Sequence, residues 1–453
     1  MPLLRRGAHV VVAHASTTAP RAREVPRRDL ETDVLPRLRN VAAEDLWRPG
    51  DVRGAGGAAA RRRVARATRV SLREAYDDCD VVSDGAWAAE LEATAPLRVD
   101  LAGGWTDTPP VAFEHGGVVT NVAVRLDGRR PIGARATRLD APVLRFRVET
   151  ADGSVLETEA AALADLDDRS NPQAPAALLK CALVVCGVVD PRGAPLDVQL
   201  AAGGLEVASW SRVPTGSGLG TSSILAACLV AAIGGAADAA YDVDARRRDI
   251  VHDVMRVEQE LTTGGGWQDN VGGVYGGAKI AVSPPRLPLT VDTTAVPMAP
   301  GLLDAHLVLA YTGRARLAKN LLQSVLRKWH ARLPGITTTT DALVAGARRA
   351  AAALEAGDLA RLGAALDAYW AQKKTMADGA EPAFIRDMIA ALRPRVHGAA
   401  LCGAGGGGFL CLITKQPNDV DAIRRVLEAH ADLGDVSLHV ATVDREGLTL
   451  ARS

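Results

Sequence analysis

Apolar positions along the chain follow two different periods, and both are evident from about residue 95 onward. Short runs of strand type, rich in β-branched residues and bounded by turn residues, lie at 96–103, 116–126, 141–150, 195–202, 409–413 and 436–443. Longer segments with helical spacing predict helices at Ala176–Val188, Ser222–Gly234, Asp244–Thr262, Leu317–Arg332, Thr340–Glu355, Asp358–Thr375 and Ala383–Leu392. This mixture within one chain predicts an α+β fold.

Two changes in amino-acid composition suggest where the chain divides into domains. Residues 1–70 are rich in Pro, Arg and Ala, and RGAGGAAARRR at 53–63 is typical of a linker. A proline-rich stretch, SPPRLPL, lies at 283–289. We therefore expect a weakly structured N-terminal extension over 1–90, one domain over 91–290 and a second over 291–453.

Composition excludes several classes of partner. The chain has 453 residues with 53 basic and 53 acidic side chains, so its net charge of zero gives no electrostatic reason to bind nucleic acid or an anionic membrane. Six cysteines without a CxxC pair are expected to be free thiols, and the histidines lack metal-ligand spacing. The apolar run Ile224–Ala237 is shorter than the roughly 20 residues that span a bilayer. We expect a cytoplasmic protein, and the sequence carries no signal of oligomeric state.

One stretch, RVPTGSGLGTSSILA at 212–226, combines three alternating glycines with Thr and Ser directly before an apolar helix. Hydroxyl side chains are favoured where a helix begins, and glycine allows the backbone to approach a ligand closely. Free N–H groups at such a helix start attract phosphate. The alternative is an ordinary glycine-rich turn into a core helix.

Another glycine-rich stretch, LCGAGGGGFL at 401–410, contains GxGxxG at Gly403, Gly405 and Gly408. A dinucleotide site needs a helix after this motif, whereas FLCLI predicts a strand, so a tight loop between two strands fits better. The sequence contains no Gly-Lys pair, which excludes a P-loop.

Two carboxylates stand near a third glycine run in VEQELTTGGGWQDN at 257–270. Glu258 is expected near the end of a helix, and Asp269 follows Gly264–Gly266. Such a pair suits a metal and a substrate hydroxyl respectively. The alternative is a solvated helix charge and a residue that caps a turn.

Taken together, the order R-V-D-L-x-G-x-x-T-D, P-x-x-S-G-L-G-T-S-S and G-x-G-G-G-F resembles the small-molecule kinases named for galactose, homoserine, mevalonate and phosphomevalonate, the GHMP kinases. Four longer blocks are similar to the L-fucokinase branch of that family, at 262–273, 311–329, 369–388 and 397–415. The resemblance implies an N-terminal half like the second domain of ribosomal protein S5 and a ferredoxin-like C-terminal half. It also implies ATP-dependent, Mg²⁺-dependent phosphorylation of a sugar, with L-fucose and its anomeric hydroxyl as the expected acceptor.

The same resemblance implies a role for each matching residue. Asp269 is expected to face the sugar hydroxyl, Arg98 to stand beside it, and Ser222 with Glu258 to hold Mg²⁺. The ATP-binding residues are expected to be Pro214, Gly216, Ser217, Gly218, Leu219, Gly220, Thr221, Ser222 and Ser223. The substrate-binding residues are expected to be Asp107, Trp105, Gly104, Gly265, Gly266, Gly405 and Gly406.

One departure bears on the substrate. Galactokinase-like members carry Glu-His where this chain has Gly104 and Trp105, which argues against galactose and suits a 6-deoxy sugar whose methyl group lies against an indole. Trp105 as a core or rim aromatic is the alternative. Rival functions are a kinase for another sugar such as D-glycero-D-manno-heptose 7-phosphate, a non-catalytic sugar sensor and, least of all, a dinucleotide-binding oxidoreductase.

Overall fold

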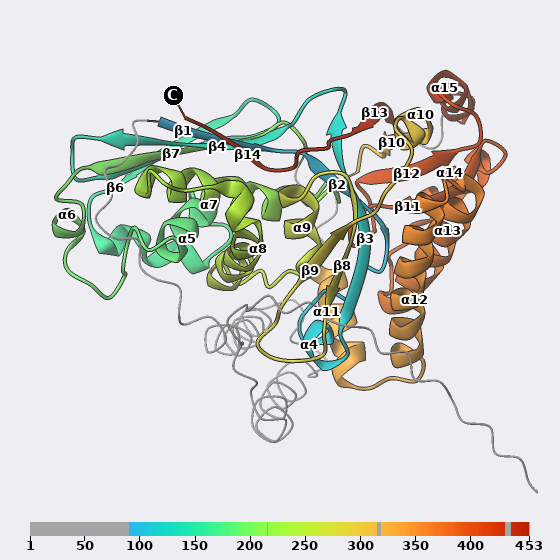
Figure 1. The fold of residues 1–453 in the computed structure, drawn as a ribbon, viewed down its shortest axis with the longest axis horizontal. Helices are drawn as coiled ribbons and strands as arrows, with labels where there is room; N and C mark the ends of the chain where they lie inside the picture. Colours follow the sequence, from blue (N-terminus) through green and yellow to red (C-terminus); the bar gives the residue numbers. More distant parts are fainter. Residues whose placement is uncertain (1–89, 215, 315–318, 431–435, 453) are drawn as a thin grey trace, which may run out of the picture.

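The computed structural model describes residues 90–214, 216–314, 319–430 and 436–452 (Figure 1). The extension expected at the N-terminus therefore lies outside the described residues apart from its last position. Two sheets organise the rest of the chain.

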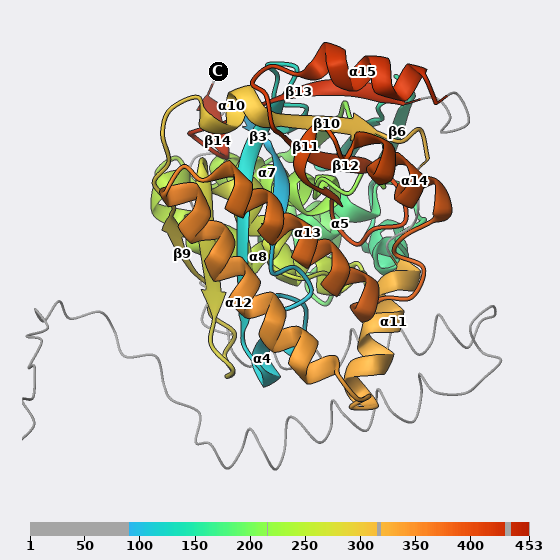
Figure 2. The ribbon, with the colours of Figure 1, turned by 90° about the vertical axis from the view of Figure 1, so that its right-hand side faces the viewer.

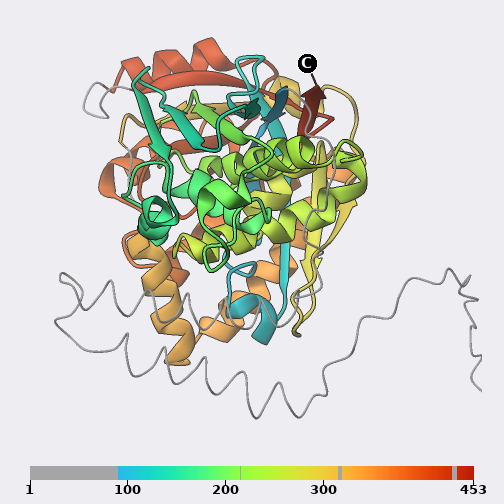
Figure 3. The same cartoon turned by 90° about the vertical axis from the view of Figure 1, so that its left-hand side faces the viewer.

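The first sheet has six strands and is covered on one face by helices (Figures 1 and 3). Its order is β14 (Thr449–Arg452), β1 (Glu90–Ala95), β4 (Ile132–Leu139), β7 (Gly204–Ser211), β5 (Leu144–Glu149) and β6 (Val155–Ala160). Only β5 and β7 pair in parallel. Helix α7 (Thr221–Ala237) packs against it, and α5 (Ala177–Val185) and α8 (Val243–Glu260) pack on α7.

The second sheet has eight strands and is built from distant parts of the chain. Its order is β11 (Val396–Leu401), β12 (Phe409–Thr414), β10 (Leu307–Tyr311), β13 (Ser437–Val443), β3 (Gly117–Leu126), β8 (Ala278–Ser283) and β9 (Asp292–Ala295), with β2 (Leu97–Ala102) paired to β3. The long helices α12 (Ile336–Glu355) and α13 (Leu359–Met376) pack against it (Figure 2). Helix α9 (Gln268–Val274) packs against β2 and β3 as well.

The remaining elements are short or peripheral. They are α4 (Val111–Glu114), the 3₁₀ helix η3 (Leu163–Ser170), α6 (Leu196–Gln199), α10 (Leu302–His306), α11 (Lys319–His330), α14 (Ala383–Leu392) and α15 (Val420–Glu428). No helix within the described ranges is both long enough and apolar enough to cross a bilayer.

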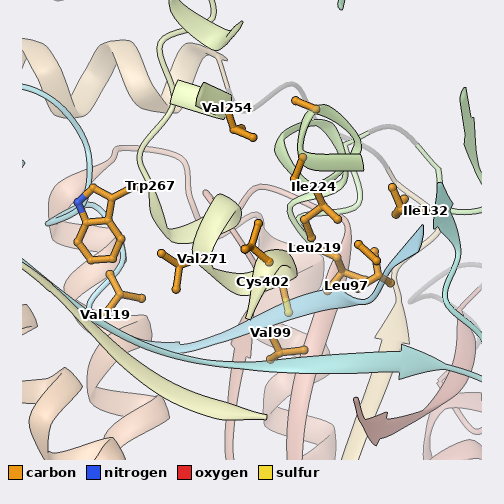
Figure 4. Close-up of a cluster of buried hydrophobic side chains, with 14 of the residues drawn as sticks. Leu97, Val99, Val119, Ile132, Leu219, Ile224, Val254, Trp267, Val271 and Cys402 are labelled. Carbon is orange, nitrogen blue, oxygen red and sulfur yellow. The ribbon is translucent and has the colours of Figure 1, made fainter. Parts of the chain in front are cut away.

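An apolar cluster lies directly beneath the candidate site and fixes the elements that build it. Leu97 and Val99 from β2, Leu219 before α7, Ile224 in α7 and Val271 in α9 are all fully buried (Figure 4). Full burial of such a side chain contributes roughly 1.5–3 kcal/mol. The starts of α7 and α9 are therefore held on β2 by packing.

Most predicted elements are confirmed. All seven predicted helices are found, within a few residues of the expected ends among the described positions. Five of the predicted strands correspond to β2, β3, β5, β12 and β13. Cysteines 181, 186, 228, 402 and 411 are free thiols, as expected, while Cys79 lies outside the described residues.

The strand expected at 195–202 is wrong, because this stretch forms the short helix α6. Its apolar residues alternate as in a strand, but Leu196 and Leu200 are also four apart, which places both on one face of a helical turn. Both are buried, whereas Val198 between them is 57% exposed. The strand of this region, β7, begins only at Gly204.

The last strand of the described residues pairs with the first one in the first sheet. Thr449–Arg452 pairs antiparallel with Leu91–Thr94, more than 350 residues earlier. The second sheet is continuous across residue 290, through the pairing of β13 with β3. The domain boundaries expected from the sequence stay a prediction.

Candidate active site

The structure brings Arg98 and Asp269 into an ion pair in which two guanidinium nitrogens share one carboxylate oxygen. The Nε and Nη2 atoms of Arg98 donate to Oδ1 of Asp269, at 2.8 and 2.6 Å. Arg98 is on β2 and buried, and Asp269 is in the first turn of α9 with 26% of its side chain exposed. Burial lowers the pKa of Arg98, but the charges of Asp269 and Asp100 outweigh that effect and raise it. The guanidinium is permanently charged.

The glycine loop at 213–223 lies against this pair. Gly216, Gly218 and Gly220 have φ of 78°, 81° and 78°, in the left-handed region that glycine adopts without strain. A Cβ on Gly220 would lie 3.2 Å from Cγ of Arg98 and 3.3 Å from Cβ of Asp269. Arg98 also donates to the Gly218 carbonyl oxygen through Nη1, at 2.6 Å. The loop therefore touches both members of the ion pair.

The start of α7 differs from the expectation of a hydroxyl cap. The N-cap is Gly220, and no side-chain oxygen bonds to the first turn there. Glycine occupies the cap because Arg98 and Asp269 leave little room for a side chain. The N–H groups of this first helical turn are accordingly not satisfied by a cap side chain, which is the arrangement that favours an anion.

Glu258 approaches the same helix start from α8. Its Oε1 accepts a hydrogen bond from the hydroxyl of Ser223, whereas Ser222 is exposed. Its Oε2 is buried with no hydrogen bond of good geometry in the described part of the chain. Burial, together with the nearby charges of Asp269 and Asp107, raises the pKa of Glu258 to about 8.

Asp107 is a second fully buried carboxylate, close enough to Glu258 for its charge to act on that group. Its two oxygens accept hydrogen bonds from the backbone N–H of Trp105, at 3.0 Å, and of Gln268, at 3.1 Å. Burial, reinforced by the charge of Asp269, raises the pKa of Asp107 to about 7. Asp107 thus connects the turn after β2 to the start of α9.

The glycines that precede α9 pack directly on these two carboxylates. A Cβ on Gly265 would lie 2.5 Å from Oε2 of Glu258, and one on Gly266 would lie 2.0 Å from Oδ2 of Asp107. Larger residues would displace the carboxylates.

Gly104 and Trp105 form the turn after β2. A Cβ on Gly104 would lie 2.2 Å from the hydroxyl oxygen of Tyr369 in α13 and 3.0 Å from Oε1 of Gln268. Trp105 has φ of 80°, an unusual value for a large residue, and its buried Nε1 has no hydrogen-bond partner within the described ranges. Backbone strain of this kind clusters at active sites and ligand clamps.

The loop at 403–408 connects β11 to β12, as the sequence predicted, and packs on the glycine loop before α7. Phe409 N donates to the Ser217 carbonyl oxygen at 2.8 Å. A Cβ on Gly403 would lie 2.9 Å from the Gly218 carbonyl oxygen. Gly405 and Gly406 instead contact Ala380. The expected sugar contacts of those two glycines stay a prediction.

Sequence reasoning missed three residues that the structure places behind Arg98. Asp100, Tyr369 and Lys373 are buried and joined by hydrogen bonds. Asp100 belongs to the R-V-D-L motif, and the other two belong to the block at 369–388. The sequence offered one signal for these residues, namely a polar side chain within an otherwise apolar segment.

The fold and the motifs agree with comparisons to known proteins. A family model described as the GHMP kinases N terminal domain matches residues 183–277, and one described as GHMP kinases C terminal matches residues 350–433. Solved structures support the same fold. Lactococcus lactis galactokinase complexed with galactose superposes with a TM-score of 0.59 at 16% identity, covering 86% of this chain and all of the other. This is the GHMP kinase fold.

Within that class, the chain is similar to L-fucokinases. It is 31% identical over 347 residues to the bifunctional fucokinase/GDP-fucose pyrophosphorylase of Arabidopsis thaliana, covering 76% of this chain and 32% of that protein. It is 30% identical over 396 residues to the L-fucokinase/L-fucose-1-P guanylyltransferase of Bacteroides fragilis, covering 85% and 40%. The chain therefore spans about a third of the length of the first relative and two fifths of the second. The resemblance to the L-fucokinase branch is confirmed.

A heptose kinase is also among the structural neighbours. A D-glycero-D-manno-heptose 1-phosphate kinase from Bacteroides thetaiotaomicron superposes with a TM-score of 0.57 at 19% identity, covering 80% of this chain and 99% of the other. At that identity the likeness concerns the fold alone.

Proposed function

We propose that the protein transfers the γ-phosphoryl group of ATP to the anomeric hydroxyl of L-fucose, giving L-fucose 1-phosphate and ADP. The observation that carries this proposal is the Arg98–Asp269 ion pair in contact with the glycine loop before α7. Phosphoryl transfer depends on positioning and charge stabilisation, which such a pair next to an anion site supplies. The similarity to two proteins named as fucokinases supports the choice of sugar.

Asp269 is the proposed acceptor of the hydroxyl proton. Both hydrogen bonds from Arg98 go to Oδ1, and Oδ2 accepts none from the described residues. The sugar oxygen, hydrogen-bonded to Oδ2, attacks the γ-phosphorus while the bond to the bridging oxygen of ADP breaks and the proton passes to Asp269. Arg98 holds the carboxylate ionised and stabilises charge on the transferring group.

The first turn of α7 is proposed to receive the ATP phosphates. Its backbone N–H groups and the positive end of the helix attract the anion. We further propose that Ser222 and Glu258 would hold Mg²⁺, which would neutralise phosphate charge. The buried Oε2 of Glu258, which accepts no hydrogen bond of good geometry from the described residues, fits a cation. No group of three or more His, Cys, Asp or Glu is poised for a metal among the described residues, and Mg²⁺ ordinarily needs only one or two carboxylates beside phosphates.

Two features support a neutral sugar. Arg98 and Lys373 are both paired with carboxylates, and the buried Lys279 donates to backbone carbonyl oxygens, so none of these three serves as a dedicated partner for a second phosphate on the sugar. At Gly104 the hydroxyl of Tyr369 and the amide of Gln268 occupy the place of a longer side chain. Trp105 is proposed to meet the methyl group of fucose. The cytoplasmic location expected from the sequence remains part of this proposal.

A sugar panel tests the proposal directly. Purified protein with Mg·ATP is assayed for ADP release with L-fucose, D-galactose, D-glycero-D-manno-heptose 7-phosphate and mevalonate. We expect the highest kcat/KM for L-fucose, and a ³¹P signal coupled to the anomeric proton of the product. A higher kcat/KM for another acceptor would contradict the choice of sugar, and no ADP release with any acceptor would favour the non-catalytic sensor.

A further inference from the structure

Asp100 is a buried carboxylate at which three distant segments of the chain meet. Its Oδ1 accepts hydrogen bonds from the backbone N–H of Gly403, at 2.9 Å, and from Nη1 of Arg98, at 3.3 Å. Its Oδ2 accepts hydrogen bonds from the hydroxyl of Tyr369, at 2.7 Å, and from Nζ of Lys373, at 2.9 Å. Four donors use the full accepting capacity of a carboxylate.

Lys373 is the second member of this arrangement and is 1% exposed. Besides Asp100, its Nζ donates to the carbonyl oxygen of Leu401 at 2.7 Å, at the end of β11 and directly before the 403–408 loop. The ammonium also lies 4.3 Å from the centre of the Tyr369 ring. A lysine is almost never buried to this extent unless it is paired.

Asp269, Arg98, Asp100 and Lys373 thus form a chain of four charges that alternate in sign. An isolated Asp100 would compete with Asp269 for the guanidinium, because both carboxylates contact Arg98. Lys373 offsets the charge of Asp100, so Arg98 can give two N–H groups to Asp269 and only the longer hydrogen bond, at 3.3 Å, to Asp100. Burial raises the pKa of Asp100, but the charges of Lys373 and Arg98 outweigh it and keep that pKa below its ordinary value.

We propose that Lys373 and Asp100 are positioning residues, which hold Arg98 toward Asp269 and fix the loop after β11 against the glycine loop before α7. This inference rests on the proposed phosphoryl transfer by the Arg98–Asp269 pair. Neither residue touches the reacting atoms. Their action is on the geometry and charge of Arg98, so their loss lowers kcat and leaves the binding of ATP and sugar largely unchanged.

The test uses the full chain and whichever sugar the wild-type protein phosphorylates. Lys373→Met removes the ammonium at similar length, and Lys374→Met is the matched control, since Lys374 is the next residue of α13 with 40% of its side chain exposed. The double variant Asp100→Asn/Lys373→Met removes both charges. Each protein is first checked by thermal unfolding, and kcat and KM for both substrates are then measured.

We expect Lys373→Met to lower kcat by about tenfold or more with less than threefold change in either KM, because an uncompensated buried charge is left beside Arg98. The double variant should recover at least threefold of that loss. Lys374→Met should match the wild type. A folded Lys373→Met with wild-type kcat, a loss expressed in KM, or a double variant no better than Lys373→Met would overturn the inference.

Two further results keep the test decisive. If Lys373→Met does not fold, Tyr369→Phe replaces it, because this change removes one hydrogen bond to Asp100 and leaves the charges balanced. A fall in kcat at constant KM then supports the inference, and an unchanged kcat overturns it. Asp269→Asn separates this inference from the proposed function: if Asp269→Asn is inactive while Lys373→Met is normal, only the positioning role fails.

Discussion

Asp269 presents its two carboxylate oxygens to different surroundings. Oδ1 receives both hydrogen bonds from Arg98, and about a quarter of the side chain is exposed at the start of α9. Oδ1 therefore fixes the orientation of the carboxylate, and Oδ2 is left to accept a proton. Sequence reasoning named both residues, since each lies in a recognisable motif. It did not find Asp100 or Lys373, because their importance arises from a contact across 273 positions.

Asp269→Asn tests this division. The amide keeps the shape but cannot take the proton, and it offers Arg98 no charge. We expect kcat to fall by roughly 10²–10⁴-fold, with the affinity for Mg·AMPPNP within threefold of the wild type by calorimetry.

Ser222→Ala provides the contrast for that measurement, since its expected effect is weaker binding of Mg·AMPPNP. Ser223→Ala is measured in parallel, because the hydroxyl of Ser223 bonds to Glu258, and a larger loss of binding there than in Ser222→Ala would assign the metal to Ser223 instead. Near-normal turnover of Asp269→Asn, or a loss of nucleotide binding as large as that of Ser222→Ala, would mean that Asp269 is not the residue facing the sugar.

Among the elements, the segments with a single clear period were predictable and those with an ambiguous one were not. Helix α14 was predicted with the bounds that the structure has, Ala383–Leu392, because its apolar residues recur only at helical spacing. The stretch at 195–202 satisfied both periods, and packing of Leu196 and Leu200 decided for a helix. The glycine loop before α7 was singled out from the sequence, and its ATP-binding role stays a prediction. The structural reason for Gly220 is its contact with Arg98 and Asp269, which the sequence pattern alone does not reveal.

Gly220→Ala tests whether the contact of Gly220 with Arg98 and Asp269 matters for catalysis. Any residue other than glycine also costs stability at a positive φ, so a control for that cost is needed. Gly128, in the turn between β3 and β4, has φ of 77° and nothing within 4 Å of its added Cβ, so Gly128→Ala is the matched control. Both variants should lose roughly 1–2 kcal/mol of stability from backbone strain. Only Gly220→Ala should displace Arg98 and Asp269, which we expect to lower kcat by about tenfold or more.

The measurement is the melting temperature and the kcat of both variants. Equal kcat values in Gly128→Ala and Gly220→Ala, at similar melting temperatures, would show that the contact with the ion pair has no catalytic consequence.

At the scale of the whole molecule, the site exists because segments that are distant in sequence converge on β2 and on the turn that follows it. The starts of α7 and α9, the end of α8, helix α13 and the loop after β11 all contact this region. The spacing of apolar residues along the sequence was enough to predict an α+β fold. The three glycine-bearing motifs were enough to predict the family. The pairing of β14 with β1 was not predictable, because strand partners are chosen by long-range packing, which local patterns do not encode.

This convergence concentrates acidic groups, and the consequence is a stability that depends on pH and on Mg²⁺. The pKa values of Asp107 and Glu258, about 7 and about 8, lie above those of unfolded carboxyl groups. The folded state therefore holds more protons than the unfolded state between about pH 4 and pH 8, and the stabilising contribution of both groups is lost as the pH rises through 7 and 8. A bound cation would favour the ionised form of Glu258 and offset that loss.

We therefore expect the melting temperature in EDTA to fall as the pH rises from 5 to 9, and millimolar Mg²⁺ to raise it more at pH 9 than at pH 6. Glu258→Gln removes one of the two titrating groups, so both the pH dependence and the Mg²⁺ effect should become smaller. Glu355→Gln, at the exposed end of α12, is the control for removal of a surface charge and should behave as the wild type. Differential scanning fluorimetry over this pH range measures all three proteins. Equal slopes and equal Mg²⁺ effects in Glu258→Gln and Glu355→Gln would show that Glu258 neither titrates in this window nor holds the cation, and the proposed Mg²⁺ site would have to be moved away from α8.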